Sequence, residues 1–134
     1  MSRRRDERGS MAVEVVLMIP ILVLFMLLVV AGGRYVSVRA DMDAAARDAA
    51  RAASLERSSG AARSAADASA SAALEGSASC RMGGFDTDFR PGGSVTVTID
   101  CAVPNDGLGL LGLNGTLDMS ATGSAPLDTY RRTE

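Results

Sequence analysis

The feature that most constrains this chain is an uninterrupted apolar run near its N-terminus. From Val15 to Gly33 the sequence VVLMIPILVLFMLLVVAGG has 19 residues and no charged or strongly polar side chain. A helix rises about 1.5 Å per residue, so the run nearly matches a hydrocarbon core roughly 30 Å thick. We therefore predict one membrane-spanning helix, and only the rest of the chain is left for a small folded domain.

Charge is distributed unevenly around this run. The first nine residues contain four arginines, which are Arg3, Arg4, Arg5 and Arg8. No other basic residue occurs before Arg34. The positive-inside bias then places the N-terminus in the cytoplasm and everything after Arg34 outside it, as a single-pass protein of the cell membrane. The alternative is a secretory signal peptide cleaved after Ala31, which would release a secreted protein. The length of the run and Glu14 at its cytoplasmic edge argue against cleavage there.

Composition excludes several classes of function. All 14 basic residues are Arg, the chain has no His, and its net charge is −2, so no basic surface remains for nucleic acid. Without His or a cluster of metal ligands, the usual acid/base and nucleophilic arrangements cannot be assembled. We predict no enzyme activity, no cofactor, no metal site and no small-molecule substrate.

Glu14 turns the anchor into a functional hypothesis. An ionisable group at the head of a membrane helix is costly unless it is paired. If a peptidase cut after Gly9, Ser10 would carry a free amine one helical turn from Glu14, and in a bundle the carboxylate of one subunit could neutralise the amine of its neighbour. That pair would set the axial register between subunits. The alternative is that Glu14 only marks the helix start, where a negative charge suits the helix dipole.

The N-terminal third of the chain resembles a known family. Gly9-Ser10-Met11-Ala12-Val13-Glu14, followed by an apolar helix, resembles the class III signal of type IV prepilins. The longer string RGSMAVEVVLMIPILVLFMLLVVAGGRYVSVRADMDAAARDAARAAS is similar to TadE-like proteins, the minor pilins or pseudopilins of tight-adherence (Flp) pilus systems. One position departs from the family pattern, because Val15 stands where many members have an aromatic residue.

The resemblance implies a function and a set of partners. It implies that a prepilin peptidase cleaves between Gly9 and Ser10, and that Glu14 occupies the family's acidic position. It also implies that the helix contacts other pilin-like subunits, the pilus assembly machinery and the membrane. Pro20 matches the family's proline, and a proline inside a helix removes one hydrogen bond and usually kinks the axis. A membrane-anchored envelope or binding protein remains the alternative.

Beyond the membrane the helix is predicted to continue to about Ser58. Apolar residues recur there at steps of three and four, while charged residues fall on the other side, where Asp43–Arg47 and Asp48–Arg51 are spaced for ion pairs. The apolar stripe consists of Tyr35, Val38, Met42, Ala45, Ala46, Ala49 and Ala53. A second Ala-rich helix is predicted over residues 61–74, with Gly76 as its stop.

After Gly76 the period changes from helical to alternating. Residues 95–103 alternate apolar and polar side chains, which predicts a half-buried strand after the turn at residues 90–93, and a second strand is predicted over about 115–122. Residues 104–115 between them read as a loop. Two or three such strands form only a small sheet, which we expect to lean on the helix for its core.

Cys80 and Cys101 are the only cysteines. In an exported segment an even pair predicts a disulfide, which in the chain-entropy model stabilises a loop of this size by roughly 3 kcal/mol. Two thiolates without His are too few ligands for zinc. Free thiols are the alternative.

These predictions combine into a membrane-anchored α+β protein. Its expected parts are a basic leader (1–9), a transmembrane helix (10–33), an extracytoplasmic Ala-rich helical region (34–75) and a small C-terminal domain with an antiparallel sheet (76–134).

Overall fold

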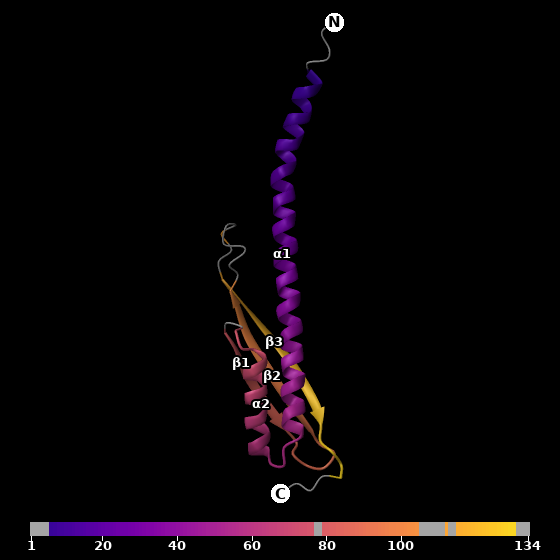
Figure 1. Cartoon of the computed structure of the whole chain (residues 1–134), viewed down its shortest axis with the longest axis vertical. Coiled ribbons are helices and arrows are strands. Elements are labelled where there is room, and N and C mark those ends of the chain that lie inside the picture. The colour runs from indigo at the N-terminus through magenta and orange to yellow at the C-terminus, as the bar shows by residue number, and fades with distance from the viewer. Residues whose placement is uncertain (1–5, 77–78, 105–111, 113–114, 131–134) are drawn as a thin grey trace. The chain divides into compact units, whose positions relative to one another are not determined.

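The computed structural model describes residues 6–76, 79–104, 112 and 115–130, with side chains from residue 11 onward. The chain consists of two units, Met1–Tyr35 and Val36–Glu134. Two helices precede three strands: α1 (Asp6–Ser54), α2 (Ser59–Ala73), β1 (Cys80–Thr87), β2 (Ser94–Pro104) and β3 (Thr116–Pro126) (Figure 1). The predicted α+β class is therefore confirmed.

The first unit is the N-terminal part of α1 and carries the apolar run. Among the described residues, α1 is the one helix long and apolar enough to cross a membrane, and none of its most apolar stretch is buried. Pro20 lies inside this helix.

In the second unit, the predicted stripe is the buried side of α1 from Met42 to Ala53, whereas Val38 is half-buried and Tyr35 is exposed. Met42, Ala46 and Ala49 are fully buried, and so is Ala50, which the predicted stripe omits. The helix ends at Ser54, earlier than predicted. The reason is that Ser58 caps α2 instead, since its side-chain oxygen accepts a hydrogen bond from the backbone N–H of Ala61 at 3.3 Å.

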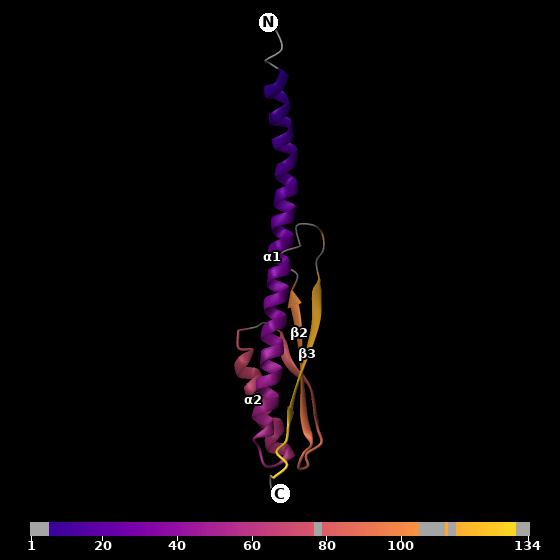
Figure 2. The same cartoon turned by 90° about the vertical axis from the view of Figure 1, so that its right-hand side faces the viewer.

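α2 buries one narrow face. Ala62, Ala66 and Ala70 lie one turn apart and are buried, as is Leu74 just beyond the helix. Gly76 has a φ of +86°, the left-handed conformation that favours glycine after a helix, so the predicted stop is correct. Figure 2 shows α2 and the C-terminal part of α1 on the same side of the sheet.

The sheet is antiparallel with the strand order β1-β2-β3. The alternation predicted for residues 95–103 is confirmed, because Val95, Val97 and Ile99 are fully buried under the helices. The opposite face is polar, and the hydroxyl oxygens of Thr98 and Thr122 lie 3.4 Å apart there. The loop predicted over residues 104–115 falls mostly outside the described residues.

β1 is the strand that the sequence pattern does not locate. Its pairing with β2 shifts register between Met82 and Gly84, which leaves Gly83 as an extra residue. Such a bulge interrupts the period of two on which strand prediction depends.

The helices and the sheet meet at very short range. A Cβ added to Gly123 in β3 would overlap the backbone of Ala46 and Arg47 in α1. Gly123 has no side chain and Ala46 has only a methyl group, so the backbones of β3 and α1 come into direct contact there. This close approach explains how a core made largely of alanine is packed.

Candidate functional site

The first candidate site is the apolar surface of α1 in the first unit. Large apolar side chains cover it all round, and most of them are at least half exposed in the isolated chain, from Met11 at 72% to Leu24 at 51%; Leu27 is an exception. A helix that is apolar on every side has no polar face for water, whereas it suits lipid or other apolar helices. Its backbone groups are paired within the helix, as a hydrocarbon environment requires.

Glu14 is the one ionisable residue between Met11 and Gly33. Its side chain is exposed, and neither of the ion pairs found among the described residues includes it. A carboxylate at the head of an apolar helix without a cation from its own described residues is suited to pairing with another molecule.

The two residues of the predicted cleavage site lie in the first part of α1. The backbones of Gly9 and Ser10 are helical, and their side chains fall outside the described part of the chain. Arg3, Arg4 and Arg5 of the basic leader fall outside it as well. The cleavage at Gly9–Ser10, the register role of Glu14 and the kink at Pro20 stay predictions.

The second candidate site is the disulfide in the second unit. Cys80 and Cys101 are bonded to each other, and they are directly opposite in the pairing of β1 with β2. The bond therefore fastens the start of β1 to the sheet. It forms part of the packing layer, since Cys101 is 2% exposed.

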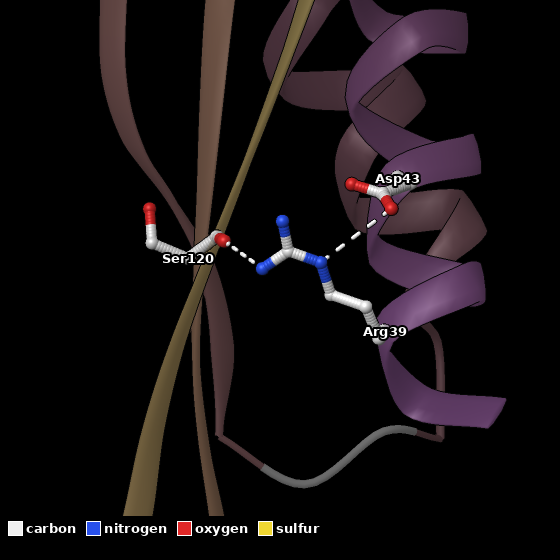
Figure 3. Close-up of polar contacts among 3 residues, drawn as sticks. All are labelled: Arg39, Asp43 and Ser120. Atoms are coloured by element: carbon white, nitrogen blue, oxygen red, sulfur yellow. Dashed lines mark hydrogen bonds and ion pairs between the residues drawn. The ribbon is translucent and has the colours of Figure 1, made fainter. Parts of the chain in front are cut away.

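A polar contact between α1 and β3 was not anticipated from the sequence. Arg39 donates from Nη1 to the backbone oxygen of Ser120 at 2.6 Å, and its Nε lies 3.5 Å from Asp43 Oδ2 (Figure 3). The predicted pair of Asp43 with Arg47 is therefore wrong. Asp43 instead lies one turn after Arg39 and orients the arginine that reaches the sheet, whereas Arg47 is exposed. No sequence signal identifies this contact, because a backbone oxygen of β3 is its acceptor.

The outer face of the sheet has an open depression of about 600 Å³. Arg81, Asp100 and Asp118 contribute charges of both signs to its lining. Within the described part of the chain, no three His, Cys, Asp or Glu side chains are grouped so that they could hold a metal ion. The depression therefore has mixed polar character without an assembled metal site.

Comparison with protein families bears on the first of these sites. Residues 9–51 match the family model described as TadE-like protein. The N-terminal helix is TadE-like. This confirms the resemblance predicted from the sequence, and the matched segment lies entirely within α1. No curated protein and no solved structure matches the chain.

The TadE-like segment contains the exposed apolar surface, Glu14 and Pro20, together with most of the buried alanine stripe. The match is a likeness of this segment to TadE-like proteins, and the segment carries the one helix in the described part of the chain that is long and apolar enough to cross a membrane. The family match ends before the sheet begins, so it carries no information about the outer depression or the disulfide.

Proposed function

We propose that the chain is a TadE-like minor pilin or pseudopilin that assembles through its N-terminal helix. The observation that carries the proposal is the TadE-like segment itself, a helix with exposed apolar side chains and Glu14 as the single ionisable residue of its apolar half. An exposed apolar helix is held in the membrane before assembly and packs against like helices afterwards. Both states remove the same side chains from water.

In this proposal a prepilin peptidase cuts between Gly9 and Ser10. The new amine of Ser10 then lies about one helical turn from Glu14 and has the opposite charge. A carboxylate of one subunit pairs with the amine of its neighbour, and in an apolar setting each charge is strongly disfavoured without the other. The pair thus aligns neighbouring helices along their axes. The exported second unit is carried on the outside.

N-terminal sequencing of the protein recovered from membranes tests the processing step. The chain is expressed with its pilus system, and we expect a mature chain that begins at Ser10. A Gly9→Leu variant is the matched control and should keep its leader. An uncut N-terminus in the parent protein would favour an anchored envelope protein, and a chain that begins at Gly32 in the medium would favour a secreted one. Either result would overturn the proposal.

The register role of Glu14 is tested separately, by counting pili on cells that carry variants. Glu14→Gln keeps the size of the side chain and removes its charge, and we expect cleavage to continue while pilus number falls at least about tenfold. Glu14→Asp keeps the charge and should retain more assembly than the Gln variant. Normal pilus numbers with Glu14→Gln would remove the register role and leave cleavage and membership of the system unaffected.

A further inference from the structure

Among the described strands β3 lies at one edge of the sheet with no strand on its outer side, called here the free edge, and the hydrogen bonds of the sheet show which residues face it. The backbone N–H of Ala102 donates to Ser79, on the β1 side of β2, so the even-numbered residues of β2 face β1. The odd-numbered residues then face β3, where Val97 is opposite Gly123. Odd-numbered residues of β3 therefore face β2, consistent with the bond from Leu127 N–H to Gly93. The even-numbered ones point their N–H and C=O groups away from the sheet.

The two edges of the sheet differ in how well they could accept another strand. β1 has 8 residues and is interrupted by the bulge at Gly83, and α2 lies against it. β3 has 11 residues and pairs with β2 without a register shift. A long, regular edge with unpaired backbone groups is a template for pairing with another chain, whereas a short, bulged edge is a poor one. The edge of β3 is thus the one that requires protection.

Arg39 occupies the middle of that edge. Ser120 is even-numbered, so its carbonyl oxygen points outward, and this is the oxygen that accepts the 2.6 Å hydrogen bond from Arg39 Nη1 (Figure 3). Asp43 holds the other side of the guanidinium at 3.5 Å. A strand that paired with β3 would need the same carbonyl for its own N–H, and it would have to displace or bury a charged side chain that is 46% exposed.

We infer that Arg39 guards the free edge of β3 against strand addition by a second copy of this chain. A second copy is the relevant competitor because copies anchored in one membrane share a small volume, which raises their effective concentration. The inference uses the contacts of the second unit together with membrane anchoring, and it does not depend on the proposed pilin function. It gives Arg39 a role that is separate from support of the helix, in which a single i,i+4 ion pair contributes only a few tenths of a kcal/mol.

The proposed role of Arg39 is tested by measuring self-association of the full chain in detergent micelles by sedimentation velocity. Arg39→Ala should lower the apparent dissociation constant for self-association by about tenfold or more relative to the parent chain. Arg47→Ala is the matched control, since it removes the same charge from an exposed position on the same helix and should leave the constant unchanged. Equal constants for the two variants would overturn the inference.

A second substitution distinguishes an exposed edge from a weakened fold. Thr122 is even-numbered, so its backbone N–H points away from β2. Thr122→Pro therefore removes that N–H and leaves the hydrogen bonds to β2 intact, as is usual for proline on an edge strand. We expect Arg39→Ala/Thr122→Pro to return to the association constant of the parent chain. Arg39→Ala/Thr122→Ala loses the same hydroxyl contact with Thr98 and should stay associated. Continued association of the proline variant would mean that the β3 edge is not the surface involved, and the inference would fail.

Discussion

The two halves of α1 have the same backbone conformation and opposite surroundings. From Met11 to Val36 the large apolar side chains are at least half exposed, with few exceptions, whereas Met42 and the alanines that follow it on one face are fully buried. The large apolar side chains of the apolar half project on all sides, and none of the described ones is buried. The alanine half has so little side chain that β3 reaches its backbone at Gly123. Small side chains therefore allow the alanine half to pack closely against the sheet.

The largest difference between the two halves is expected when an arginine is introduced into each and membrane insertion is compared. Leu24 is at the centre of the apolar run, and Leu24→Arg should make membrane insertion less favourable by about 3.5 kcal/mol. Ala44→Arg introduces the same group on the exposed side of the other half and should leave insertion unchanged. Alkaline extraction of membranes reports insertion. If both variants remain equally membrane-bound, the apolar half does not span the bilayer.

Two methionines on the same helix give the next largest contrast. Met42 is 0% exposed and Met26 is 70% exposed. Met42→Ala leaves a cavity in the core and should lower the free energy of unfolding of the second unit by about 3 kcal/mol. Met26→Ala should change it by less than about 0.5 kcal/mol. Urea denaturation in detergent micelles, followed by circular dichroism, measures both. Similar losses would mean that the apolar half also stabilises the second unit.

Two glycines give the smallest effects, and the same substitution should change the free energy of unfolding in opposite directions at the two positions. Gly123→Ala forces a methyl group against the backbone of α1 and should lower the free energy of unfolding by about 2 kcal/mol. Gly60 lies in the first turn of α2, where an added Cβ meets nothing within 4 Å. Gly60→Ala should raise the same free energy by about 0.5 kcal/mol, because alanine favours helix. A neutral Gly123→Ala would show that α1 and β3 can separate without loss.

The sequence predicts the parts of the fold that repeat with a regular period. The stripe around Met42, the buried side of β2 and the stop at Gly76 each follow from such a pattern or from a single special backbone conformation. The pattern does not locate β1, because the bulge at Gly83 breaks the alternation of this strand. The sequence pattern predicts the end of α1 too late, because Ser58 fits either the interior of a helix or the cap of the next helix.

The candidate site was predictable in part for the same reason. The apolar helix and its TadE-like segment can be recognised from local sequence, since each residue needs only its neighbours to be interpreted. The bond from Arg39 to Ser120 joins residues that are 81 positions apart and uses a backbone oxygen, which every residue has. Neither spacing nor residue type identifies such a contact, so it becomes visible only when the positions of α1 and β3 in the structure are known.

The disulfide also determines how the second unit responds to tension. Cys80 and Cys101 are 21 positions apart, and the strand pair β1 and β2 lies largely within the ring that they close. A pulling force along the chain passes through the S–S bond and bypasses the residues between the two cysteines. Those residues would otherwise extend by roughly 70 Å, at about 3.4 Å per residue, and the bond withholds that length. We therefore expect that, when the chain is pulled, β3 separates from β2 before β1 does.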